Sequence, residues 1–300
     1  MFAMVHHKTA ERIFRIALSL PPTELSLSDA INLPKAQQLC WDAMESPDRD
    51  EIIQLAVEAT KLTPLCADAF TLLADAICYN DADRLILFGW ATRVGELCCR
   101  ERIAENTSHL HGFIDARPYM RARTALAETL RRVGRYEEAL QHYEELLSME
   151  RYDHIAAAML MTGNLELRRL SAAKELIERL AESGGTYQRY SYLIWRWLAG
   201  AAKHEFEAAL RMALHSNRFV PILLADPNTP YERSPFGVTS GGADEAAEYV
   251  AVSNRLWEGY PKLKRAVIAG AKRLTPLVEA ERAAQRREIR RKAGLPDEPA

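Results

Sequence analysis

Residues 120–151 read MRARTALAETLRRVGRYEEALQHYEELLSMER and predict two antiparallel helices joined by a tight turn. Apolar side chains recur every three or four residues on both sides of Gly134, which is the spacing of an amphipathic helix. Gly134 suits the left-handed backbone conformation that ends the first helix and reverses the chain. Small residues such as Ala127 and Ala139 let the helices approach closely, while larger ones such as Tyr143 fill the space beside them. The stretch therefore predicts a helical hairpin.

The same pattern returns further along the chain, where Leu126 is matched by Leu160 and Ala139 by Ala173. Both pairs have the separation of the tetratricopeptide repeat (TPR), whose period is roughly 34 residues. Each TPR is a helical hairpin that stacks on its neighbours, because one hairpin cannot bury its apolar face alone. Fainter copies of the pattern are anchored by Ala36, Ile52, Phe70 and Ala209.

Two prolines fall at the same place in this pattern. Pro64 follows Ile52 at the same distance at which Pro221 follows Ala209. Because proline cannot continue a helix without clashing with the preceding turn, we expect each to end the second helix of its unit. With five approximate units, the sequence predicts an all-α, TPR-like helical-hairpin superhelix, an alpha-alpha solenoid with a concave inner wall.

The repeat pattern divides the chain into four parts. We expect an N-terminal helical cap over residues 1–33, TPR-like repeats over 34–225, an irregular crossover loop over 226–243, and C-terminal helices with a basic tail over 244–300. Prolines and glycines punctuate the loop, which either crosses the groove to order a binding site or links two helical parts. We expect Asp244 to cap the helix that follows the loop.

The 300 residues have an ordinary globular composition, with 48% hydrophobic and 27% charged side chains. The 39 basic and 41 acidic residues nearly balance, so no overall charge directs the chain to nucleic acid or anionic lipid. No apolar stretch approaches the roughly 20 residues that a membrane span requires. The five cysteines are odd in number and irregularly spaced, and the N-terminus lacks a signal-peptide layout. We therefore expect a reducing, cytoplasmic location.

Sequence signatures of metal binding and catalysis are missing. Cys98 and Cys99 are followed by His109 and His111, but no pair among them has the spacing of a zinc ligand set. The chain has no GxxxxGK phosphate-binding loop and no GxSxG nucleophile motif. We therefore expect no metal, no cofactor and no catalytic residues.

Two motifs are similar to those of a known family: residues 117–123 read RPYMRAR, and residues 217–224 read NRFVPILL. Over about residues 35–265 the chain resembles the suppressor of tumorigenicity 7 family of TPR-like proteins. The resemblance implies a TPR-like fold and, from the bacterial members, a soluble protein without an assigned reaction. The chain departs from the family at residues 152–156, which read YDHIA where members carry an NDNQG-like stretch. It also lacks the membrane-spanning segments of the animal members.

The concave wall of a TPR array comes mainly from the first helix of each unit. In the third unit this register places Arg121, Glu128 and Arg131 on the wall, and Arg117 is a further candidate for peptide binding. Guanidinium groups in such positions suit the carboxylates of an acidic peptide. The alternative is a solvated helix face whose terminal arginines complement the helix dipole.

The first helix of the fifth unit is rich in aromatic residues between Tyr187 and Trp197. Tyr192 and Trp195 are separated by about one helical turn and lie on one face of the helix. Because tyrosine and tryptophan are frequent anchors at binding interfaces, these rings are candidates for a peptide pocket. The alternative is that the aromatic residues pack in the core or against the C-terminal segment.

The C-terminal end of the chain is strongly basic, with 11 basic and 3 acidic residues between Lys262 and Lys292. Such a patch would bind nucleic acid, dock on an acidic surface or remain solvated. No aromatic residues suited to base stacking are interleaved with it. Five arginines crowd one predicted helix: Arg282, Arg286, Arg287, Arg290 and Arg291.

The sequence favours a noncatalytic scaffold that holds a protein or peptide partner in the concave groove of the repeat array. Pre-formed helices lose little ordering entropy when they bind a partner. Two alternatives remain open: a nucleic-acid-associated regulator that acts through the arginine-rich helix, and an enzyme with a site near residues 226–243.

Overall fold

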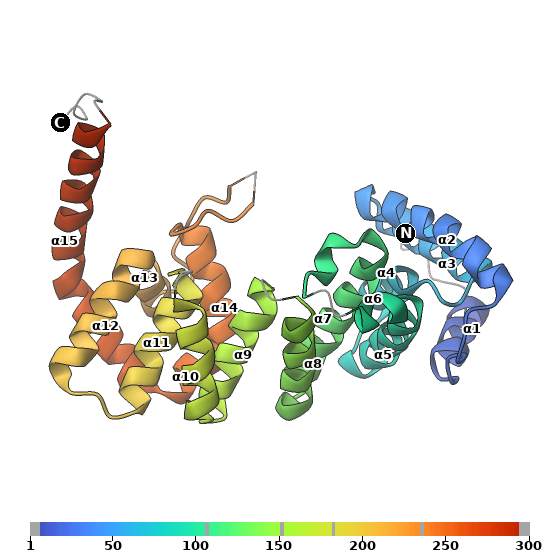
Figure 1. Ribbon diagram of the computed structural model, residues 1–300, viewed down its shortest axis with the longest axis horizontal. Coiled ribbons are helices and arrows are strands. Elements are labelled where there is room, and N and C mark those ends of the chain that lie inside the picture. The colour runs from blue at the N-terminus through green and yellow to red at the C-terminus, as the bar shows by residue number, and fades with distance from the viewer. Residues whose placement is uncertain (1–6, 106–107, 151–152, 182–183, 235–236, 294–300) are drawn as a thin grey trace. The chain divides into compact units, whose positions relative to one another are not determined.

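The computed structural model describes fifteen α-helices in residues 7–105, 108–150, 153–181, 184–234 and 237–293. Within these ranges there is no β-strand, only an isolated bridge between His109 and Glu150. The all-α class predicted from the sequence is therefore confirmed. The chain divides into two compact units, residues 1–157 and 158–300 (Figure 1).

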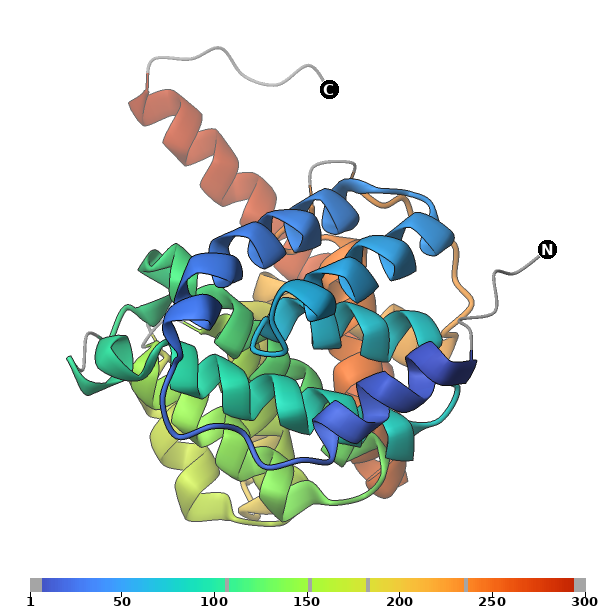
Figure 2. The same ribbon diagram turned by 90° about the vertical axis from the view of Figure 1, so that its right-hand side faces the viewer.

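The first unit consists of helices that pack on their neighbours in sequence. They are α1 (His7–Ala17), α2 (Leu27–Glu45), α3 (Arg49–Leu62), α4 (Ala67–Ile77), α5 (Asp81–Cys98), α6 (Arg100–Ala104), η1 (Leu110–Gly112), η2 (Ile114–Ala116), α7 (Arg117–Arg132) and α8 (Tyr136–Met149). Packing runs from α2 through α3 and α4 to α5, then from α5 to α7 and α8, and α1 lies against α5. Figure 2 shows α2 and α3 side by side. α4 also contacts both α2 and α7, so these three alternate helices are neighbours.

Side chains and one glycine mark the ends of these helices. The Ser26 hydroxyl accepts a hydrogen bond from the Asp29 N–H at 3.1 Å and caps α2. Asp48 caps α3, and Asn80 caps α5, in the same manner. Gly134 has a φ of +85° between α7 and α8, which confirms the predicted left-handed turn.

The core of the first unit combines alanines with a few large aromatic side chains. The alanines that define the repeat pattern are buried, since Ala127 and Ala139 have at most 1% of their surface exposed. The Trp90 ring of α5 lies 6.0 Å from the Phe70 ring, measured between centroids. Its indole N–H donates to the Pro64 carbonyl at 3.0 Å, so the polar atom of this buried side chain is satisfied.

α5 and α7 approach each other closely at a glycine. A Cβ atom added to Gly95 would lie 2.9 Å from the Cα of Tyr119, well inside van der Waals contact with backbone. A side chain at this position would push the two helices apart. Gly89, earlier in α5, has room for a side chain. The atom nearest to a Cβ added there is at the end of the Arg93 side chain, 3.6 Å away.

The second unit has a core centred on aromatic side chains of two helices, α11 and α14. Beyond α9 (His154–Glu166), which contains the division between the units, the helices are α10 (Leu170–Arg179), α11 (Thr186–Leu198), α12 (Lys203–Ser216), α13 (Val220–Ala225), α14 (Ala243–Gly259) and α15 (Pro261–Lys292). α11 packs on α10, α12 and α14, while α15 packs on α12, α13 and α14. Tyr190, Tyr249 and Trp257 are at most 1% exposed.

Two polar side chains fix the irregular segment between α13 and α14. The Asn217 side chain is fully buried and donates to the Gly242 carbonyl at 2.8 Å. The Glu245 carboxylate accepts from the Gly241 N–H at 2.6 Å and from the Thr186 hydroxyl at 2.7 Å. The end of the expected crossover loop is therefore held against α11 and α12.

Three expectations from the sequence differ from the structure. The expected boundary at residue 33 falls inside α2, because this helix continues through Pro34. Pro221 stands in the first turn of α13 instead of ending α12, since proline fits the first turn of a helix, where its missing N–H has no partner to lose. Asp244, the expected N-cap, stands inside the first turn of α14, and its carboxylate accepts from the Thr239 N–H at 2.9 Å.

α15 has an apolar half and a basic half. Buried residues from Leu263 to Val278 hold the first half on α12 and α13. The second half extends beyond the other helices of the second unit (Figure 1). No helix in the described part of the chain is long and apolar enough to cross a membrane.

The glycines of α5 give a matched pair of stability predictions. Gly95→Ala is expected to lower the free energy of unfolding, because the new methyl group collides with the backbone of α7. Gly89→Ala is expected to raise it by about 0.5–1 kcal/mol, because alanine restricts the unfolded chain and nothing obstructs the methyl group. Chemical denaturation of the two variants checks this, and equal stabilisation by both would contradict the close contact at Gly95.

Candidate functional site

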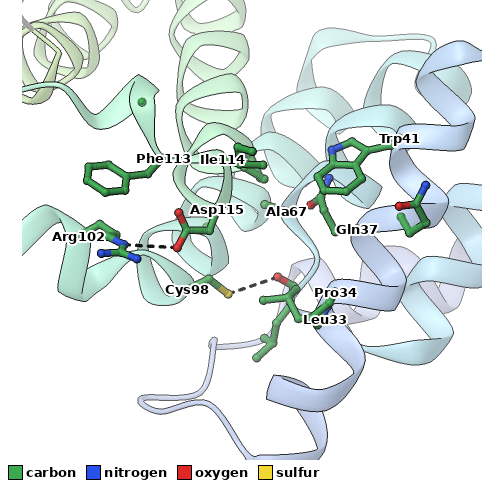
Figure 3. A pocket seen from close by; sticks show the side chains of 15 residues that line it. Leu33, Pro34, Gln37, Trp41, Ala67, Cys98, Arg102, Phe113, Ile114 and Asp115 are labelled. Carbon is green, nitrogen blue, oxygen red and sulfur yellow. Dashed lines mark hydrogen bonds and ion pairs between the residues drawn. The ribbon is translucent and has the colours of Figure 1, made fainter.

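A hollow of about 720 Å³ lies between α2 and the segment that joins α5 to α7 (Figure 3). We call it the α2 groove. Apolar side chains dominate its lining, and a few polar groups stand among them. The lining from α2 is Leu33, Pro34, Gln37, Gln38 and Trp41. The joining segment and the start of α7 provide Arg102, Gly112, Phe113, Ile114, Asp115 and Pro118. The turn before α4, α4 itself and α5 provide Leu65, Ala67, Gly95 and Cys98.

Trp41 provides much of the apolar surface on the α2 wall. The preceding residue, Cys40, is fully buried, so Trp41 is turned about 100° away from the core side of the helix. It remains 39% exposed. Leu33, Gln37 and Trp41 follow one another at intervals of about one helical turn and share one face of α2. Figure 3 shows Gln37 and Trp41 on the side of the groove opposite Phe113.

The opposite wall is fastened by a carboxylate from the end of α8. Glu150 is 8% exposed and accepts from the His111 N–H at 3.0 Å. The Nε of Arg117 donates to the His111 carbonyl at 3.0 Å. Arg117, one of the predicted peptide-binding residues, therefore holds the joining segment from α7 and lies outside the lining of the groove.

A second set of contacts holds the rim of this wall. The Arg102 guanidinium pairs with the Asp115 carboxylate at 3.5 Å and lies over the Phe113 ring, 4.7 Å from its centroid. Ile114, which precedes Asp115 in the sequence, is 59% exposed. The wall thus combines an exposed apolar side chain with a charged pair.

The joining segment is the part of the site that sequence reasoning missed. Ala36, Phe70 and Arg123 each begin the same repeat pattern, in the first, second and third units. Phe70 follows Ala36 by one repeat period, but Arg123 follows Phe70 by more than one. The surplus indicates an insertion between two units, and the groove wall lies in it. The sequence also contains an indication of the role of Trp41. This large aromatic residue does not lie on the helix face that carries Ala36 and Cys40, so it is a candidate for an exposed binding residue.

A buried carboxylate joins three helices beside the groove. Asp68 of α4 has no exposed surface. The Arg121 Nε of α7 donates to its Oδ1 at 3.0 Å, and the Gln37 amide of α2 donates to its Oδ2 at 2.7 Å. Arg121, predicted to bind an acidic peptide, is therefore committed to an ion pair within the chain, although its side chain is still 38% exposed.

Glu128, another predicted wall residue, lies two turns beyond Arg121 on α7. Asp75, two turns beyond Asp68 on α4, is near enough to interact electrostatically with Glu128, so the two helices run in the same direction. Burial raises the pKa of Glu128 above 4.5, and Asp75 adds to the shift, while arginines including Arg131 oppose it. Glu128 and Arg131 lie outside the lining of the α2 groove.

Tyr192 and Trp195 lie together in the second unit, as predicted. Their rings stack with centroids 6.0 Å apart and planes inclined by 26°. The Trp195 indole N–H donates to the Leu170 carbonyl at 3.1 Å, and the Lys174 and Arg196 cations each lie 5.8 Å from the Trp195 ring centroid. Both rings are half-buried, so they support α10 and α11 while keeping part of their surface accessible.

Other aromatic residues of α11 pack against the C-terminal segment. Tyr187 and Tyr190 lie 5.2 and 5.4 Å from Tyr249 of α14, between ring centroids. Trp197 lies 5.8 Å from Tyr260, just before α15. These residues therefore pack against the C-terminal segment, which is one of the two roles expected from the sequence.

The basic residues of α15 differ in their contacts. Arg282 donates to the His215 carbonyl of α12. Arg291 pairs with Glu288 of the same helix at 2.6 Å. Arg286 and Arg287 are exposed. The cluster predicted from the sequence therefore combines arginines that hold α15 to the unit with arginines that face solvent.

All five cysteines are free thiols. The sulfur atoms of Cys40 and Cys66 are 3.6 Å apart and buried, and this contact together with burial raises the pKa of Cys40. At the base of the α2 groove, Cys98 donates to the Leu65 carbonyl at 3.7 Å, and burial raises its pKa to about 12. In the residues that the structure describes, no three His, Cys, Asp or Glu side chains are grouped to hold a metal ion.

The chain matches no model of a known protein family and no curated protein sequence. The resemblance to the suppressor of tumorigenicity 7 family, carried by residues 117–123 and 217–224, stays a prediction.

The ion pair between Arg121 and Asp68 predicts that removing the Arg121 guanidinium will greatly lower the free energy of unfolding. Arg121→Met leaves a buried carboxylate with only Gln37 as donor and is expected to lower the free energy of unfolding by about 3 kcal/mol. Arg132→Met is the control, because it removes an ion pair with Asp81 that is 3.0 Å long but exposed, and is expected to cost less than about 1 kcal/mol. Similar small effects in denaturant titrations of both variants would contradict the structural role of Arg121.

The raised pKa of Glu128 predicts that replacing this carboxyl group with a neutral amide will stabilise the fold, and that the gain will depend on pH. A carboxyl group with a raised pKa holds its proton more tightly in the folded state, so its ionised form destabilises the fold above that pKa. Glu128→Gln is expected to raise the thermal midpoint near neutral pH, and the advantage should shrink as the pH falls through the folded pKa. Glu101→Gln, at an exposed position of α6, is the control. A gain that stays constant down to acidic pH would contradict the assignment.

Proposed function

We propose that the chain is a noncatalytic protein-binding scaffold whose α2 groove holds an apolar segment of a partner peptide. The observation that carries the proposal is the groove itself, with a half-exposed tryptophan facing an exposed isoleucine across it. Pockets that bury ligands are typically about 300–1,000 Å³ and mostly apolar, with a few polar groups that fix orientation. The α2 groove, at about 720 Å³, has both properties.

The arrangement of helices in the first unit supports a TPR-like solenoid. In a TPR array, the first helices of successive hairpins lie side by side and form the concave wall. Here α2/α3, α4/α5 and α7/α8 are the hairpins, and α4 contacts both α2 and α7. The ion pair of Asp68 with Arg121 joins α4 to α7. The α2 groove would then be a local deepening of this concave side.

The chemistry of the groove favours a peptide with a large apolar side chain. Trp41 and Ile114 are 39% and 59% exposed, and covering the apolar surface that remains in water stabilises a complex by about 25 cal/mol per Å². The Arg102 guanidinium, which is 41% exposed, provides hydrogen-bond donors at the rim for the backbone of an extended segment. Because the far wall is already held by Glu150 and Arg117, binding requires little ordering of the scaffold.

The five free thiols fit a reducing compartment, and we place the protein in the cytoplasm on that basis. The partner would then be a cytoplasmic protein with an exposed apolar segment. An amphipathic helix or an extended strand would satisfy this description.

Selection from a random peptide library displayed on phage tests the proposal with the full-length chain. The enriched peptides are expected to share an aromatic or large aliphatic anchor. Synthetic copies should bind Trp41→Ala at least about tenfold more weakly than the original chain, because truncation of an interface aromatic typically costs more than about 1 kcal/mol. Fluorescence anisotropy of labelled peptides measures the affinities.

Tyr79→Ala is the matched control, because Tyr79 is an aromatic residue of the same unit, 91% exposed and outside the groove. Its affinity for the peptides should stay within about twofold of the original. Ile114→Asp, on the other wall, should weaken binding as Trp41→Ala does. Peptides that bind all of these variants equally well, or a selection that enriches none, would refute the proposal.

A further inference from the structure

A second hollow, of about 460 Å³, lies in the second unit between the start of α13 and the basic half of α15. Three arginines line it, and they come from two places in the fold. Arg218 precedes α13, whereas Arg282 and Arg286 project from successive turns of α15. We call this hollow the arginine pocket; Phe219, Gly241, Glu279 and Ala283 complete its lining.

Two of the three arginines are held in place by contacts within the unit. Arg282 is half-buried and donates to the His215 carbonyl. Arg218 pairs with Glu279 and lies over the Phe219 ring, 5.1 Å from its centroid. These contacts fix where the two guanidinium groups lie before any ligand arrives, which lowers the entropic cost of binding.

The charges in the pocket are not balanced. Three guanidinium groups face one carboxylate, Glu279, so the lining carries an excess of two positive charges. Glu281, on the same helix, is already engaged by Arg211 and His215. The backbone N–H of Gly241 donates to Glu245, so the loop supplies no free donor at this point. The guanidinium groups are therefore the donors that a ligand would meet.

We propose that the arginine pocket binds a terminal phosphate group. A phosphate monoester carries a charge of about −1.5 to −2 at neutral pH and three acceptor oxygens, which matches the excess charge and the forked donors of the arginines. A carboxylate or the phosphodiester of a nucleic-acid backbone carries a single negative charge and leaves the pocket unbalanced. The site is separate from the α2 groove in position and in chemistry.

Inorganic phosphate is the first probe, added to the full-length chain and followed by isothermal titration calorimetry. Chloride at the same ionic strength corrects for general screening. Saturable binding with one site per chain is expected, and Arg286→Gln should weaken it by about tenfold. Arg287→Gln is the matched control, because the next residue on the helix points about 100° away and does not line the pocket. It should change the affinity by less than about twofold.

Glu279→Gln provides a test in the opposite direction. This carboxylate competes with the ligand for Arg218, so its neutralisation should tighten phosphate binding several-fold. Loss of fold would not produce a gain in affinity, and the variant therefore separates a specific site from damage to the unit.

The source of the phosphate is distinguished by two further ligands. A small phosphate monoester should bind at least as well as inorganic phosphate if the natural ligand is a metabolite. A phosphoserine peptide that binds more tightly than both, and more tightly than its unphosphorylated form, would assign the pocket to phosphorylated partners.

Three results would overturn the proposal. The first is no saturable binding of phosphate at millimolar concentrations. The second is an equal loss of affinity in Arg286→Gln and Arg287→Gln, which would indicate a diffuse basic surface. The third is tighter binding of a single-stranded oligonucleotide without terminal phosphates than of phosphate itself, which would favour nucleic acid along α15.

Discussion

The carboxylate of Asp68 is surrounded by protein, and one donor from each of two other helices reaches it. A buried carboxylate is unfavourable unless its oxygens are hydrogen-bonded, so Gln37 and Arg121 stabilise the first unit by donating to Asp68. Because these donors belong to α2 and α7, the three alternate helices are fixed at one spacing. Trp41 lies on the same helix face as Gln37, one turn further along. The position of the apolar groove wall is therefore set by a polar contact behind it.

The α2 groove and the arginine pocket rely on different physical forces. In the α2 groove, most of the available free energy would come from covering apolar surface that now faces water, and the polar rim would set orientation. In the arginine pocket, the free energy of binding would come from charge, so binding would weaken as the salt concentration rises. In both hollows, groups outside the lining hold the lining in position. The Glu150 carboxylate holds the far wall of the groove, and the His215 carbonyl holds Arg282. A scaffold arranged in this way loses little entropy on binding.

The sequence predicts the parts of the fold that repeat. The hairpin around Gly134 and the buried alanines Ala127 and Ala139 follow from a helical period and a turn residue, both of which are local properties. The groove wall could not be derived in this way, because it lies where the period is interrupted. Its fastening depends on Glu150 and His111, which are 39 residues apart and carry no common pattern. The helical register singles out Arg121, but its partner Asp68 is 53 residues away on another helix, and no local pattern connects the two.

The thiols of Cys40 and Cys66 have a consequence for how the first unit can be monitored. They are enclosed where α2 meets the start of α4, and the raised pKa of Cys40 keeps it in the unreactive protonated form. An alkylating reagent can reach them only when these helices separate. The rate at which they become labelled under native conditions would therefore report how often this part of the molecule opens, without any engineered probe.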